Sequence, residues 1–291
     1  LLEIGRDVME TKRTSLQSLY RFIIRKVLLT PFLFKPVGYF SRHSKVTTKS
    51  LKPSNVRSKV LLLGGCVQPT LAPNINHSIK NILAKLDVEV IDGLQSDCCG
   101  ALDKHLAASK SAMKQVKRNI DKWSLQLNSG VEVIISSASG CGVMVKDYPS
   151  LFKKSDPYYE KAIIVSSKTQ DISEYLANKD LSEFRLSETN ISYHEPCTLQ
   201  HGQKLSGLVE SILSQFGYIK KPIRDSHICC GSAGTYSIFE SEISNQLLVD
   251  KLENLNASSP EMIVTSNIGC LMHLQKGSSI PVKHWVELLD V

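Results

Sequence analysis

Short apolar runs alternate along the chain with longer segments whose apolar residues recur every three or four positions. The run Lys59–Leu63 predicts a buried strand, and the spacing of apolar residues over Pro73–Leu86 predicts a helix. Val88–Ile91 predicts a second strand, Leu102–Leu127 a long helix, and Val131–Ser137 a third strand. Strands that alternate with helices are typical of an α/β fold with a mainly parallel sheet.

The same order of elements returns in the second half of the chain. Ile191–Tyr193 predicts a strand, helices are expected over Leu205–Phe216 and Ile238–Leu255, and Glu261–Thr265 predicts a further strand. The pattern therefore predicts an α/β protein made of two similar repeats, each a parallel sheet with flanking helices.

Positive charge is concentrated before the first predicted strand. The chain has a net charge of +7, and residues 1–60 hold 13 Lys and Arg against 3 Asp and Glu. Within this part, residues 13–40 form a basic amphipathic stretch, too interrupted by charge to cross a membrane. It could lie on an anionic membrane or pack on a neighbouring domain or subunit. Its basic residues lack interleaved aromatic residues at stacking spacing, so binding to nucleic acid is the least favoured of the three alternatives.

These observations predict three parts of the chain. Residues 1–58 are expected to form a helical leader and linker, because the basic stretch is followed by a segment rich in Ser, Thr and Lys. Residues 59–185 and 186–291 are expected to form the two repeated domains. Each of these domains contains the same arrangement of cysteines, which is the most specific motif of the sequence.

The cysteine pattern is Cys, Cys-Cys-Gly, Gly-Cys, and it occurs twice. The first cysteine precedes the Cys-Cys-Gly motif by 32 positions in both repeats. A matching gap in a four-cysteine pattern indicates two copies of one functional unit. The first set is Cys66, Cys98, Cys99 and Cys141, and the second is Cys197, Cys229, Cys230 and Cys270.

Each of these cysteines follows a predicted strand, so the four thiols of a repeat are expected to meet at one edge of its sheet. Four thiolates suit zinc or an iron–sulfur cluster. The chain has none of the short Cys-x-x-Cys knuckles of structural zinc sites, which favours the larger cluster. Disulfide exchange, or simple packing of some cysteines as small apolar residues, are the alternatives. Adjacent cysteines rarely bond to each other, which favours reduced thiols in a cytoplasmic protein.

Glycines and histidines beside the thiols are further candidates for binding a cofactor. His194 and His201 flank Cys197, and His273 follows Cys270 by three positions; each could serve the bound group or be an ordinary core or surface histidine. No nucleotide-binding or nucleophile motif is found, so substrate chemistry is expected in another subunit. The glycines that would allow close approach to a bulky group are Gly65, Gly100, Gly140, Gly231 and Gly269.

The doubled pattern resembles the cysteine-rich domain shared by heterodisulfide reductases, anaerobic glycerol-3-phosphate dehydrogenases and the lactate-utilisation iron–sulfur protein. The longer phrases Gly65–Leu71, Pro196–His201 and Cys229–Tyr236 are most similar to the iron–sulfur subunits of bacterial glycolate oxidase. This resemblance covers essentially the whole chain. Heterodisulfide reductase repeats have a further cysteine where this chain has Met144 and His273, which argues against a five-cysteine cluster.

The resemblance implies an electron-transfer subunit of an oxidoreductase, with [4Fe–4S] clusters on the eight cysteines. A partner subunit that binds FAD would oxidise glycolate to glyoxylate, and electrons would pass on to quinone or another acceptor. A subunit of a lactate or other 2-hydroxy-acid dehydrogenase, or a non-redox scaffold, are the alternatives. The family's ferredoxin module is absent, so the chain is expected to be a fragment. A cytoplasmic location is expected, with peripheral contact at the inner face of the membrane through residues 13–40.

Overall fold

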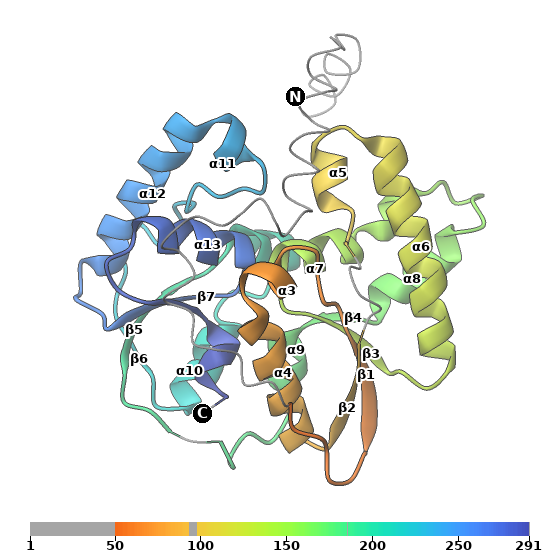
Figure 1. Cartoon of the computed structure of the whole chain (residues 1–291), viewed down its shortest axis with the longest axis horizontal. Coiled ribbons are helices and arrows are strands. Elements are labelled where there is room, and N and C mark those ends of the chain that lie inside the picture. The colour runs from red at the N-terminus through yellow and green to blue at the C-terminus, as the bar shows by residue number, and fades with distance from the viewer. Residues whose placement is uncertain (1–49, 93–97, 185, 291) are drawn as a thin grey trace.

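The computed structural model describes residues 50–92, 98–184 and 186–290. It contains two four-stranded parallel sheets, one in each half of the chain, which lie on opposite sides of the molecule in Figure 1. The predicted α/β class with two parallel sheets is therefore confirmed. The amphipathic stretch at 13–40 and most of the leader predicted at 1–58 lie outside the described residues.

The first sheet has the strand order β2-β1-β3-β4. Its strands are β1 (Ser58–Leu62), β2 (Val88–Asp92), β3 (Val133–Ser136) and β4 (Thr169–Asp171). All three pairs of neighbouring strands are parallel, so their carboxyl ends share one edge. Its helices are α3 (Gln68–Leu71), α4 (Pro73–Lys85), α5 (Ala101–His105), α6 (Ser109–Asn128), α7 (Ser139–Lys146), η2 (Tyr148–Leu151), α8 (Tyr159–Ser167) and α9 (Ile172–Leu176).

The second sheet repeats this topology as β6-β5-β7-β8. Its strands are β5 (Asn190–His194), β6 (Ile219–Lys220), β7 (Met262–Thr265) and β8 (Val282–His284), again parallel throughout. Its helical segments are the π-helical η3 (Thr198–Gln203), α10 (Leu208–Gln215), α11 (Tyr236–Phe239), α12 (Ser241–Asn256), α13 (Ile268–Gly277) and η4 (Trp285–Leu288). None of the helices in the described residues is long and apolar enough to span a membrane.

Two local expectations were wrong. The helix expected over Leu102–Leu127 is divided into α5 and α6, because Ala107 adopts a left-handed backbone conformation with φ of +55° and ends the first helix. The pattern also missed β4, β6 and β8, which have only two or three residues each. Such short edge strands carry too few apolar positions to produce a recognisable alternation.

One hydrophobic core continues from the first half of the chain into the second. Val60 and Ile79 of the first half belong to the same cluster of buried residues as Ile263 and the fully buried Trp285 of the second half. A further cluster in the first half centres on Trp123. The two sheets fall within 59–185 and 186–291 apart from the first residue of β1, but a shared core means that the division into two domains stays a prediction.

Asp171 and His284 occupy equivalent places at the ends of the fourth strands, and each caps the helix that follows. Both also reach across to the other half of the chain. The amide Nε2 of Gln203 lies 3.4 Å from Asp171 Oδ2, and His284 Nε2 donates to the carbonyl of Ser137 over 2.9 Å. The two buried side chains therefore tie the halves together in a nearly reciprocal way.

Burial raises the pKa of Asp171 to about 6. Since an unfolded Asp titrates near 3.9, the folded chain binds more protons between about pH 4 and 6, and its stability falls as pH rises through that window. Asp171→Asn stays neutral, so the variant should gain about 3 kcal/mol relative to the native chain between pH 4 and 7. Urea unfolding of both proteins across this range measures the difference.

The difference between the two proteins is the informative quantity because His284 acts with the opposite sign. Burial lowers the pKa of His284 to about 4, which makes stability rise with pH between about pH 4 and 6.5. This contribution is the same in both proteins and cancels. Unfolding free energies that run parallel with pH in the two proteins would contradict the prediction.

Candidate metal centres

The first group of thiols lies at the carboxyl edge of the first sheet. Cys66 follows β1, Cys98 and Cys99 follow β2, and Cys141 lies in the first turn of α7 after β3. The Cys66 and Cys99 thiols both hydrogen-bond to Cys98, which accepts from them, and the Cys99 thiol also pairs with Cys141. The fold thus brings together the four cysteines that the sequence assigned to one site, although they span 75 positions of the chain.

The second group has the same construction on the second sheet. Cys197 follows β5, Cys229 and Cys230 follow β6, and Cys270 lies in the first turns of α13 after β7. The hydrogen-bonding order is the same, from Cys197 to Cys229, then Cys230, then Cys270. All eight cysteines are free thiols. Two equivalent four-thiol sites therefore occupy equivalent edges of the two sheets.

The pKa of the first cysteine of each Cys-Cys pair is strongly lowered. The hydrogen bond from the Cys66 thiol is the main cause that lowers the pKa of Cys98, to about 3, and the bond from Cys197 lowers that of Cys229 to about 2. Hydrogen bonds to the neighbouring thiols, together with burial, raise the pKa of Cys66, Cys197 and Cys230, whereas the hydrogen bond from Cys230 lowers that of Cys270. A cation placed among these sulfurs would favour the thiolate form of all four.

Glycine follows each Cys-Cys pair because the backbone turns back on the sulfur there. Gly100 and Gly231 both have φ of +87°, a conformation that favours glycine. Their amides point at the preceding thiols, with Gly100 N 3.5 Å from Cys98 Sγ and Gly231 N 3.3 Å from Cys229 Sγ. Gly65 also has positive φ, while Gly140 and Gly269 lie in the first turns of α7 and α13. All five glycines thus lie within two residues of a thiol.

His194 gives the second site a nitrogen donor for which the described residues around the first site show no equivalent. It is 1% exposed, and its ligand nitrogen, Cys230 Sγ and Cys270 Sγ lie within 4.8 Å of one another. Neither ring nitrogen has a hydrogen-bond partner of ordinary geometry, although the ring helps the Cys230 thiol to lower the pKa of Cys270. The residue three positions before the first cysteine is Leu63 in the first half. A buried, unpartnered imidazole beside thiols fits a ligand at this site.

The other two candidate histidines are placed differently. His273 Nε2 lies 3.2 Å from Ser244 Oγ and 3.4 Å from the Ser244 carbonyl oxygen, so this nitrogen faces α12. Burial lowers the pKa of His273, while the nearby Cys270 thiol acts in the opposite direction. His201 is exposed on η3, and within the described residues no hydrogen bond joins it to a cysteine. Only His194 therefore contacts the thiols directly.

Several polar residues around the thiols were not singled out from the sequence. Asn119 Nδ2 donates to the carbonyl of Cys98 over 2.8 Å, and the Tyr148 hydroxyl donates to that of Cys99 over 2.9 Å. Asn267 Nδ2 lies 3.6 Å from Cys270 Sγ. Lys251 is buried on α12 near the second site. For Asn119 and Lys251, the sequence offered one indication: each polar residue lies on the same helical face as the apolar residues of its helix. The sequence offered no indication for the others.

Loops next to the two sites meet at the contact between the halves of the chain. The loops that lead into α7 and α13 touch, because Ser139 N donates to the carbonyl of Ser266 over 3.4 Å. A Cβ atom at Gly140 would lie 3.8 Å from Asn267 Oδ1, and one at Gly234 would lie 3.8 Å from Leu102. Chain that follows the two Cys-Cys-Gly motifs therefore meets in one part of the molecule, and Figure 1 shows α7 and α13 on the same side of the two sheets there.

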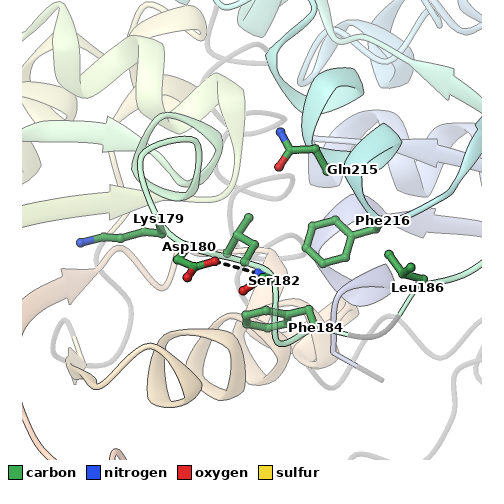
Figure 2. A pocket seen from close by; sticks show the side chains of 8 residues that line it. Lys179, Asp180, Ser182, Phe184, Leu186, Gln215 and Phe216 are labelled. Atoms are coloured by element: carbon green, nitrogen blue, oxygen red, sulfur yellow. Dashed lines mark hydrogen bonds between the residues drawn. The ribbon is translucent and has the colours of Figure 1, made fainter.

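The hollows on the described surface lie apart from the thiols. Figure 2 shows a cavity of about 260 Å³ in which Phe184 and Phe216 face the segment around Asp180, whose carboxylate accepts from the amide of Ser182 over 3.0 Å. A second, of about 330 Å³, lies between α6 and the segment after η2, beside Phe152. No cysteine or histidine lines either cavity. The candidate chemistry of the described residues is therefore concentrated at the two thiol sites.

Comparisons with known proteins agree with this geometry. The glycolate oxidase iron-sulfur subunit of Escherichia coli (strain K12) is 37% identical over 308 residues, covering 100% of this chain and 76% of the relative. The probable glycolate oxidase iron-sulfur subunit of Bacillus subtilis (strain 168) is 28% identical, covering 76% of this chain and 50% of the relative. Lactate utilization protein A of Bacillus licheniformis is 26% identical, covering 80% of this chain and 99% of the relative.

The match to a family follows the repeat. The model of the CCG cysteine-rich domain matches residues 60–146 and 191–275, which together make up more than half of the chain. Each matched segment begins at the first central strand of its sheet and ends within or near the helix that carries the closing cysteine. On the matched sequence, the doubled sheet and the paired thiol sites, the chain belongs to the family of cysteine-rich CCG-domain proteins.

Proposed function

We propose that the chain is the iron–sulfur electron-transfer subunit of a glycolate-oxidising enzyme complex. The observation that carries this proposal is the pair of equivalent four-thiol sites at the carboxyl edges of the two sheets. The 37% identity over the whole chain to a protein named glycolate oxidase iron-sulfur subunit supports the choice of substrate. The chain would serve as an oxidoreductase subunit, with the oxidation of glycolate to glyoxylate carried out by a partner.

The donor set at each site fits an iron–sulfur cluster. Four thiolates are what a [4Fe–4S] cluster requires, and we assign Cys66, Cys98, Cys99 and Cys141 to one site and Cys197, Cys229, Cys230 and Cys270 to the other. The unpartnered ring nitrogens of His194 support a ligand in the second site, because a buried imidazole without a hydrogen bond is costly. A cluster held there supplies reversible one-electron transfer.

The surrounding residues would hold and tune the group. The amides of Gly100 and Gly231 donate toward the sulfurs of Cys98 and Cys229, which lowers the negative charge that these sulfurs carry. We assign the same supporting role to the backbone at Gly65, Gly140 and Gly269 and to His201 and His273. Cys99 and Cys230 are at most 4% exposed, so the inner cysteine of each Cys-Cys pair is shielded from water, whereas Cys66, Cys98, Cys141, Cys197 and Cys229 are half-buried.

The proposed complex includes a partner flavoprotein that binds FAD and delivers electrons to this chain, which passes them to quinone or another acceptor. We place it in the cytoplasm, with peripheral contact at the membrane through residues 13–40, and assign 59–185 and 186–291 as its two cysteine-rich domains. The match to lactate utilization protein A favours a second candidate, the corresponding subunit of a lactate or other 2-hydroxy-acid dehydrogenase. Activity of the co-purified complex on glycolate and on lactate discriminates between the two.

The metal content of the anaerobically purified chain tests the proposal. We expect iron and acid-labile sulfide in equal amounts and no stoichiometric zinc, because the four thiols of each site are gathered without the short Cys-x-x-Cys knuckles of structural zinc sites. Zinc alone, or no metal after reconstitution with iron and sulfide, would overturn the assignment and favour a non-redox scaffold. Iron with activity on lactate alone would retain the electron-transfer role and replace the substrate.

A further inference from the structure

Lys251 is a buried cation with no anionic side chain to pair with. The residue is 1% exposed on α12, and its Nζ donates to the carbonyl of Ser226 over 2.8 Å. Within the described residues, no carboxylate lies in ion-pair range of this ammonium group. A lysine in such a position is rare in proteins because burial without a counter-charge is costly.

The charged neighbours of Lys251 are the thiols of the second site. Burial lowers the pKa of Lys251, and the four groups that act against burial are Cys230, Cys197, Cys229 and Cys270. Because the Ser226 carbonyl that binds Nζ lies three residues before Cys229, the ammonium group lies beside the loop that leads to the Cys-Cys pair of the second site. Ionised sulfurs, or an anionic cluster among them, are the counter-charge that the rest of the described structure does not provide.

The equivalent position in the first half is neutral. Gly100 packs on the carbonyl of Ala112 in α6, and Gly231 packs on that of Ser244 in α12. Seven positions further along each helix come Asn119 and Lys251, respectively. The amide Nδ2 of Asn119 donates hydrogen bonds to the Cys98 carbonyl and to the Tyr148 hydroxyl. The repeat thus places a buried ammonium at one site where it places a neutral amide at the other.

Near the first site, the described cation that acts on a thiol is the solvent-exposed Arg118. Arg118 contributes least among the causes that lower the pKa of Cys98, and its side chain is exposed. An exposed charge is screened by solvent and ions, whereas a buried one acts through a medium of low dielectric constant. The two halves also differ three positions before the first cysteine, where the second half has His194 and the first half has Leu63.

We propose that Lys251 raises the reduction potential of the second thiol site above that of the first. This inference rests on the proposed function, since it concerns a redox group held by the cysteines. Reduction adds negative charge, and a fixed positive charge in a buried environment stabilises the reduced state. Because the reduction potential of the second site is then the higher of the two, an electron that enters this chain resides mainly at the second site.

Redox titration of the full chain, followed by low-temperature electron paramagnetic resonance, tests this order directly. The two signals are assigned with Cys98→Ser and Cys229→Ser, each expected to remove the signal of its own site. In the native chain, the signal lost in Cys229→Ser should be reduced first as the potential is lowered. A first-site signal that is reduced before the second would overturn the proposal without any Lys251 variant.

Lys251→Met removes the charge while keeping an apolar side chain of similar reach. At a fixed potential, the ratio of reduced to oxidised second site should fall about tenfold, equivalent to about 59 mV for one electron, with no change at the first site. Lys251→Arg should keep the native value. Lys276→Met, which removes an exposed cation from α13, is the matched control and should change neither signal.

The outcomes separate this inference from the function on which it rests. Iron and sulfide at both sites with an unchanged second signal in Lys251→Met would overturn the role of Lys251 and leave the electron-transfer function standing. A native chain without iron or sulfide would overturn both. If Lys251→Met loses its metal, the native order of reduction and the Lys251→Arg value decide the question.

Discussion

Cys230→Ser is expected to empty the second site of iron and to abolish electron transfer through the complex. Cys230 lies between Cys229 and Cys270 in the line of thiols and belongs to the buried group that also includes His194. Serine has a similar size but offers a hydroxyl of high pKa, which is a poor ligand for iron beside thiolates. The iron content of the chain should fall by about half, and glycolate-dependent reduction of an acceptor by the complex should be lost.

The fold should survive this change. The substitution exchanges sulfur for oxygen at a site that is 1% exposed, and the cost of burying the hydroxyl is about 1–3 kcal/mol when it lacks a partner. Circular dichroism should therefore match that of the native chain. Cys99→Ser is the matched control: it should lose the other half of the iron and retain the second-site signal. Full activity of the complex with Cys230→Ser would sink the ligand assignment.

The grouping of the eight cysteines was accessible from the sequence because two physical rules act together. Parallel strands place the residues that come after them at one edge, and the repeat fixes which cysteines belong to which sheet. Cys66 and Cys141 could thus be placed together although β2, α4 and α6 lie between them. The glycines after the Cys-Cys pairs could be anticipated for the same reason, since the turn at Gly100 or Gly231 has positive φ.

The asymmetry between the sites could not be anticipated in the same way. Lys251 shares a helical face with Leu248 and Leu255, and this pattern alone does not separate a buried ammonium from an edge residue whose charged end reaches water. The cross-contacts of Asp171 and His284 likewise depend on how the two sheets pack. β6 has two residues and no apolar alternation, so even the strand that leads to Cys229 could not be recognised in the sequence.

Gly231→Ala should destabilise the chain far more than the equivalent Gly100→Ala. Both glycines have φ of +87°, so alanine introduces the same backbone strain of about 1–2 kcal/mol at either position. The surroundings differ. A Cβ at Gly231 would lie 2.4 Å from the carbonyl oxygen of Ser244, whereas one at Gly100 would meet Val116 Cγ2 at an ordinary 3.4 Å.

The clash at Gly231 has no easy relief. Ser244 is fully buried in α12, and its hydroxyl already donates to the Gly231 carbonyl over 2.8 Å, so the loop and the helix are joined at this point. Moving α12 would disturb Lys251 and the thiols together. Added strain from overpacking is about 1–3 kcal/mol, which brings the expected loss to about 2–5 kcal/mol for Gly231→Ala against about 1–2 kcal/mol for Gly100→Ala.

Urea unfolding of the two variants, prepared anaerobically beside the native chain, measures this difference. Because relief of the clash would displace the turn whose Gly231 amide points at Cys229 Sγ, Gly231→Ala should lose second-site iron along with stability, while Gly100→Ala, which meets no such clash, should keep iron at both sites. Equal losses of stability in the two variants would show that the left-handed backbone alone decides the cost. The close approach of α12 to the second Cys-Cys-Gly turn would then have no energetic consequence.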